Sequence, residues 1–130
     1  MALFIVCEEK VDFDTFVNGK ALSKVIDELD KVAAELGAQP LMSFFSMEPD
    51  EALSFLEDHD VELESIEVPE VQWFSAREGL ATVRSLLEFL QQNVDVVANR
   101  ESVVSDLQEF EKVLSQADAG NIRWYLAIDF

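Results

Sequence analysis

Residues 75–93 read SAREGLATVRSLLEFLQQN, and this stretch decides the fold class. Its apolar side chains recur at the three- and four-residue spacing of one helix face: Leu80, Val83, Leu86, Leu87 and Leu90. The spacing predicts a helix over 76–93. Ser75, followed three residues later by Glu78, predicts a capping box at its start. Gly79 in the first turn costs about 1 kcal/mol relative to alanine, which indicates close packing against a neighbouring element.

Two other segments have the same periodicity. One predicts a helix over 19–36 with Gly37 as its C-cap, and the other a helix over 100–118 that follows the N-cap Asn99 and closes at Gly120. Their inward-facing residues are Leu22, Val25, Ile26, Leu29, Val32, Ala33 and Leu36 in the first, and Val103, Leu107, Phe110, Leu114 and Ala117 in the second. Helices therefore dominate the predicted fold.

The remaining elements are shorter. Proline suits the first helical position, so a helix over 49–58 is expected. Residues 3–7 are apolar on every side chain, as in a strand covered on both faces, and 122–128 alternate as a second strand does. An alternating acidic stretch leaves a third, edge-type strand open near 60–68. With the two terminal strands paired, the prediction is one α+β domain over 1–130, mostly helical, with four helices packed on a small sheet.

The charge excludes some classes of function. The chain carries 27 acidic and 9 basic side chains, a formal charge of -18, which disfavours binding to nucleic acid or to an anionic membrane surface. Eleven of the acids lie in the 45 residues between Lys31 and Arg77, where no lysine or arginine occurs. Hydrophobic residues make up 49% of the chain, so the sequence predicts a folded protein despite its charge.

The N-terminus and the single cysteine indicate a cytoplasmic protein. The apolar run over 2–7 has no basic residue before it and is too short for a signal peptide. Charge-free residues 36–47 fall well short of the roughly 20 needed to cross a bilayer. Cys7 lies in the most apolar segment, where it is expected to be a small buried side chain.

Motifs for catalysis are scarce, so an enzyme is the minority interpretation. No glycine-rich phosphate loop, nucleophile elbow or cysteine–histidine pair occurs, and no catalytic residue or cofactor is predicted. The sole histidine, His59, stands between Asp58 and Asp60, which leaves a metal or acid–base site as an alternative. Neighbouring side chains point apart in both a strand and a helix, so a solvated acidic loop is the simpler interpretation.

Residues 41–47 read LMSFFSM and come directly before the acidic stretch. Aromatic and methionine anchors with a charged rim are typical of interaction sites. We therefore predict a partner-binding site made of Phe44, Phe45, Met47, Glu48, Asp50, Glu51, Asp58, Asp60, Glu62 and Glu64. The alternative is that an irregular segment buries both phenylalanines, and the same alternative applies to Trp73 and Phe74.

Three stretches, VDFDTFVNGKAL at 11–22, WFSAREGLATVRSLLEFL at 73–90 and RWYLAIDF at 123–130, resemble small bacterial proteins of about this length. That group has no known function, so the resemblance implies a bacterial cytoplasmic origin and no residue roles.

Three functions remain. The first is an acidic interaction module that binds a basic protein, as an immunity or inhibitor protein does when it caps a toxin or nuclease. The second is an enzyme or small-ligand protein with an acidic pocket around Asp58, His59 and Asp60. The third is a structural protein that forms a homo-oligomer through its Phe/Met segment.

Overall fold

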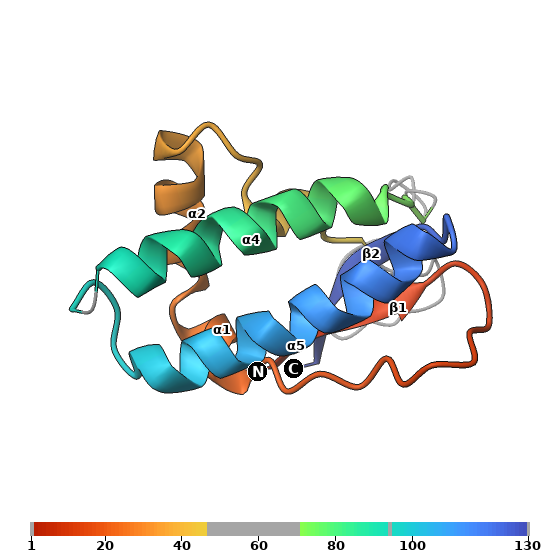
Figure 1. Cartoon of the computed structure of the whole chain (residues 1–130), viewed down its shortest axis with the longest axis horizontal. Coiled ribbons are helices and arrows are strands. Elements are labelled where there is room, and N and C mark those ends of the chain that lie inside the picture. The colour runs from red at the N-terminus through yellow and green to blue at the C-terminus, as the bar shows by residue number, and fades with distance from the viewer. Residues whose placement is uncertain (1, 47–70, 94, 130) are drawn as a thin grey trace, which may run out of the picture.

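The protein has an α+β fold in which helices pack on a two-stranded antiparallel sheet (Figure 1). The computed structural model describes residues 2–46, 71–93 and 95–129. Within them the elements are β1 (Ala2–Cys7), α1 (Lys20–Lys24), α2 (Ile26–Glu35), the 3₁₀ helix η1 (Leu41–Phe44), α4 (Ala76–Gln92), α5 (Arg100–Ala119) and β2 (Trp124–Asp129). The predicted fold class is confirmed. The helix predicted over 49–58 and the strand left open near 60–68 lie outside the described residues.

The sheet joins the two ends of the chain, as predicted. β1 and β2 pair along their full length, from Ala2 opposite Asp129 to Cys7 opposite Trp124. Alternate residues of paired strands share a face. The inner face therefore carries Leu3, Ile5, Cys7, Trp124, Leu126 and Ile128. The opposite face, called here the outer sheet face, carries Ala2, Phe4, Val6, Tyr125, Ala127 and Asp129.

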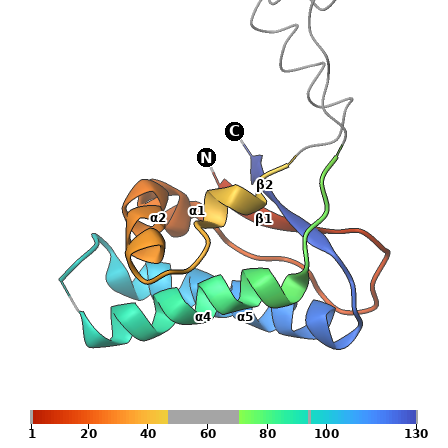
Figure 2. The same ribbon diagram turned by 90° about the horizontal axis from the view of Figure 1, so that it is seen from above.

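The two long helices lie on one side of this sheet (Figure 2). α4 and α5 run antiparallel and pack against each other along their lengths. Ser75 is the N-cap of α4, as predicted, but its side chain makes no capping hydrogen bond, so the predicted capping box is wrong. The contact with β2 holds this end of the helix instead, because the indole N–H of Trp124 donates to the Ser75 carbonyl oxygen (3.2 Å).

Gly79 allows α4 to approach β2 closely. A Cβ atom at this position would lie 2.3 Å from the Trp124 ring, which confirms the close packing expected from the sequence. The same indole stacks on Phe44 of η1, with 5.2 Å between ring centroids, and Phe74 meets Phe44 edge-on at 5.4 Å. These rings join α4, η1 and β2 into one core. No helix in the described part of the chain is long and apolar enough to cross a membrane.

The helix expected over 19–36 is broken at Val25 into α1 and α2. Val25 has φ −119° and ψ 12°, outside helical geometry, and Val25 and Ile26 are both buried. The reason is tertiary: α1 packs against α5, whereas α2 packs against α4 and η1. A straight helix along 19–36 would have to give up one of these contacts.

Both helix ends predicted from glycine use a left-handed residue. Gly37, at φ 78°, follows α2, and the N–H of Ala38 reaches back to the Ala33 carbonyl (2.8 Å), as in a Schellman motif. At the end of α5 the left-handed residue is Asn121 (φ 56°), since Gly120 has φ −94°. Gly120 therefore ends the helix without providing the left-handed turn.

Candidate functional site

Phe44 and Phe45 of the predicted partner site lie in different surroundings. Its ring is fully buried in the core, so it is not available to a partner, and this corrects the expectation that Phe44 is an anchor. A consecutive pair cannot point the same way, and Phe45 accordingly lies half-buried beside Leu126 of β2. The other predicted members lie outside the described residues: Met47, Glu48, Asp50, Glu51, Asp58, Asp60, Glu62 and Glu64, together with His59 of the metal alternative.

The acidic segment is residues 47–70, and the described residues on either side of it are hydrogen bonded to β2. The Ser46 N–H donates to the Leu126 carbonyl (3.1 Å), and Phe74 exchanges two backbone hydrogen bonds with Trp124 (2.8 and 2.9 Å). The Gln72 N–H donates to the Ser46 hydroxyl (2.9 Å), so the chain leaves and returns at one place. The sequence between holds ten acidic side chains and no lysine or arginine, against 17 acidic and nine basic in the rest of the chain.

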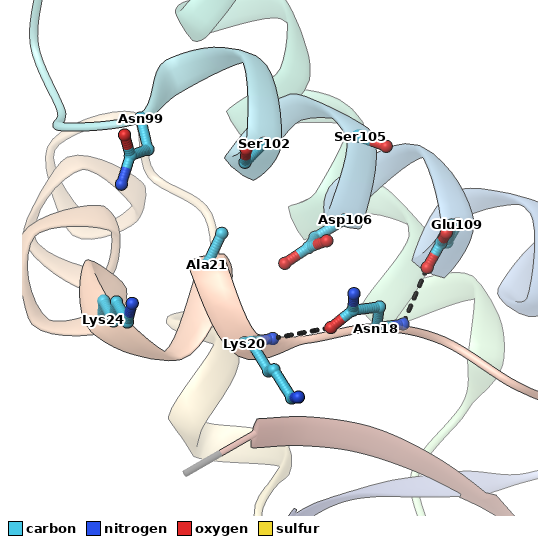
Figure 3. Close-up of a pocket in the computed structure, with 9 residues that line it drawn as sticks. All are labelled: Asn18, Lys20, Ala21, Lys24, Asn99, Ser102, Ser105, Asp106 and Glu109. Carbon is cyan, nitrogen blue, oxygen red and sulfur yellow. Dashed lines mark hydrogen bonds between the residues drawn. The ribbon is translucent and has the colours of Figure 1, made fainter.

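A polar groove of about 360 Å³ lies between α1 and α5 (Figure 3). It is lined by Asn18, Lys20, Ala21, Lys24, Asn99, Ser102, Ser105, Asp106 and Glu109. Figure 3 shows the two carboxylates at one end, facing α1 and the residues before it, and Asn99 and Lys24 at the other. Charges of both signs therefore face the same groove.

The carboxylates of this groove hold backbone groups. Asp106 is buried and accepts the N–H of Leu22 (3.1 Å), so it caps α1 from a different helix. Burial raises the pKa of the Asp106 carboxyl above its usual value of 3.8, and the charge of Glu109 adds to the rise, while backbone hydrogen bonds from Leu22 and Ala21 oppose it. Glu109 accepts the N–H of Asn18 (2.7 Å). Both acids are thus part of the fold's own hydrogen bonding.

Asp30 of α2 caps η1 in the same way. Its two carboxylate oxygens accept the N–H groups of Leu41 (2.8 Å) and Met42 (3.4 Å). Burial raises the pKa of Asp30, and these hydrogen bonds oppose the rise. Neither cap was predicted, although each aspartate lies at helical spacing from apolar neighbours. A carboxylate inside an apolar helix face was the available signal.

The described residues provide no catalytic arrangement. Ser102 and Ser105 make no hydrogen bond to a base, and the described residues contain no group of three His, Cys, Asp or Glu side chains placed to hold a metal. Cys7 is half-buried, and burial raises the pKa of its thiol, which disfavours the reactive thiolate.

The outer sheet face is the other uncommon feature. Five of its six positions are uncharged, the exception being Asp129, and Tyr125 and Ala127 are buried although neither belongs to the core cluster formed with the helices. Trp73 packs on Tyr125 with 5.1 Å between ring centroids, and Phe4 is 36% exposed. On β2 this face is therefore buried, and its accessible apolar surface lies along β1.

Comparisons with protein families, with characterised proteins and with solved structures gave no match.

Proposed function

We propose that this protein is a non-enzymatic acidic interaction module that binds a basic protein partner, in the manner of an immunity or inhibitor protein. The observation that carries the proposal is the charge of the acidic segment. Ten carboxylates fall within 24 residues that contain no lysine or arginine. Concentrated charge of one sign attracts a partner of the opposite sign and accelerates the encounter.

The attachment of the acidic segment supports this interpretation. Its two flanks are held on β2, through Ser46 on one side and Phe74 on the other, and Ser46 also bonds Gln72. The charge is therefore tethered at one known place on the fold.

Affinity capture from the native host lysate tests the proposal. The baits are the wild-type protein, a variant with Glu62, Glu64, Glu67 and Glu70 changed to Gln, and a matched control. The control carries the same change at Glu28, Glu35, Glu88 and Glu101, which are exposed on the helices. Both variants have the same net charge, so only the location of the lost charge differs.

We expect wild type and control to retain one basic protein at low salt and to release it at high salt, and the segment variant to retain much less. Equal capture by the two variants would show that net charge, and not the acidic segment, is responsible. Capture that is unaffected by salt would contradict electrostatic attraction altogether.

A further inference from the structure

We infer that the polar groove between α1 and α5 binds a small zwitterion, a molecule with an ammonium group at one end and a carboxylate at the other. This site is separate from the proposed partner site and does not depend on it. The groove has a volume of about 360 Å³. Small-molecule sites span roughly 300–1,000 Å³, so the groove fits a ligand of amino-acid size.

The acidic end of the groove has carboxylate oxygens available to a ligand. Asp106 and Glu109 lie three residues apart on α5, and therefore on one face of the helix. One oxygen of Glu109 accepts the Asn18 N–H, and its other oxygen has no hydrogen-bond partner among the described residues. Neither carboxylate forms an ion pair within the described part of the chain. This end is therefore suited to accept the N–H groups of an ammonium ion.

The opposite end of the groove has unpaired donors, Lys24 and Asn99 (Figure 3). Lys24 is exposed in the last turn of α1 and forms no ion pair with a described residue, although the chain has 27 acidic side chains. The side chain of Asn99 makes no capping hydrogen bond to α5. Lysine ammonium and asparagine amide groups both donate hydrogen bonds to carboxylates, so this end is suited to bind an anionic group.

The two ends together determine the class of ligand. Lys24 forms no ion pair with Asp106 or Glu109, so charges of opposite sign face one groove without neutralising each other. The formal charge of -18 repels a simple anion, and a simple cation complements only the acidic end. A zwitterion has no net charge and complements both ends, so the arrangement favours it over either singly charged ligand.

Titration of the wild-type protein with three zwitterions, followed by amide chemical shifts, tests this site. The probes are glycine, γ-aminobutyrate and ε-aminocaproate, in which the ammonium and the carboxylate lie progressively farther apart. Butyrate and butylammonium are the control probes, because each keeps one charged end of γ-aminobutyrate and lacks the other.

We expect at least one zwitterion to bind saturably. It should shift the amides of Lys24 and Asn99 at one end of the groove, and those of Asn18 and Glu109 at the other, with a single affinity. Butyrate and butylammonium should each bind about fivefold more weakly than that zwitterion, because each lacks one ion pair with the groove.

Two variants remove one charge from each end of the groove. Lys24→Gln and Glu109→Gln should each weaken the zwitterion about fivefold, the contribution of one exposed ion pair. Glutamine at position 109 keeps an oxygen for the Asn18 N–H, so the local structure is retained. Lys31→Gln on α2 and Glu88→Gln on α4 are the matched controls, since both residues are exposed and lie outside the groove. Both controls should bind as the wild type does.

Failure of all three zwitterions to bind saturably, or shifts at one end of the groove only, would overturn the inference. Equal affinities for the zwitterion and butylammonium would also overturn it, since the groove would then attract any cation. An equal loss of affinity in the groove variants and their controls would show an effect of net charge alone. Association with the basic partner is measured without these probes, so the proposed function stands or fails separately.

Discussion

Two aspartates hold helix ends to which they do not belong. Asp106 of α5 caps α1, and Asp30 of α2 caps η1. Each satisfies N–H groups that the short helix cannot satisfy itself. Burial also disfavours the charged form of each carboxyl, and it raises the pKa of both. The contribution of these two aspartates to the unfolding free energy therefore depends on pH.

Asp106→Asn should change the pH dependence of stability. A carboxyl with a raised pKa in the folded state binds its proton more tightly there than in the unfolded chain. Its contribution to the unfolding free energy is therefore fully present below its ordinary pKa of 3.8, and is lost as the pH rises through the raised value. Asparagine keeps an oxygen for the Leu22 N–H and does not titrate, so the variant should gain relative to wild type as the pH rises.

Urea unfolding followed by tryptophan fluorescence checks this at low protein concentration, because solubility is poorest near the sequence pI of about 4.1. Asp95→Asn is the control, since it removes the same charge from an exposed position. A stability difference between wild type and Asp106→Asn that is flat across acid and neutral pH would contradict the assignment.

Gly79→Ala should destabilise the protein, although alanine is the better helix former. Helix propensity alone would add about 1 kcal/mol, but the new Cβ would lie 2.3 Å from the Trp124 ring. Overpacking of a core contact costs about 1–3 kcal/mol, so we expect a net loss. Ala81→Gly, at an exposed position of α4, measures the propensity term in the same helix. A gain in unfolding free energy for Gly79→Ala would show that α4 does not lie against Trp124.

At the scale of elements, the apolar periodicity of the sequence predicted the helices that pack along a single face. It predicted α4 and α5 within a residue or two, and the alternation of the last residues predicted β2. It missed the break at Val25, because α1 and α2 separate to reach different partners, and no local signal in 19–36 marks that choice. The burial of Phe44 was likewise decided by distant residues, Trp124 and Phe74.

Substitutions at the end of α5 test which residue provides its left-handed turn. Asn121 has φ 56°, where a residue with an ordinary side chain costs roughly 1–2 kcal/mol, whereas Gly120 has φ −94°, which any residue adopts. Asn121→Ala should lower the unfolding free energy by about 1 kcal/mol, and Asn121→Gly should preserve or raise it. Chemical denaturation measures both. The paired variant Gly120→Ala should have the smaller effect, and the reverse order would contradict the assigned turn.

At the scale of the whole molecule, the acidic segment and the described helices and strands occupy different parts of the chain. The acidic segment lies between residues 46 and 71, and both flanks are hydrogen bonded to β2. The sequence located this charge, and the structure located the place where it is attached. Phe44, which the sequence predicts as an anchor for a partner, belongs to the core instead. A linear sequence does not show which apolar residues share a face after the termini pair.

Replacement of residues 48–70 by a short glycine–serine linker should leave cooperative unfolding intact. Ser46 and Gln72 are already in hydrogen-bond contact, so closing the chain between them adds little loop entropy. Circular dichroism and urea unfolding provide the measurement, with a scrambled 48–70 sequence as the control. Loss of a cooperative transition in the linker variant alone would show that the acidic segment is needed for folding.

The ionic-strength dependence of the association rate tests the central claim, that the acidic segment attracts a basic partner. The captured partner is mixed rapidly with wild type, with the segment variant and with its charge-matched control over a range of salt concentrations. We expect the association rate to fall steeply with salt for wild type and control, and to be slower and to change much less with salt for the segment variant. Equal slopes for the segment variant and its control would contradict it.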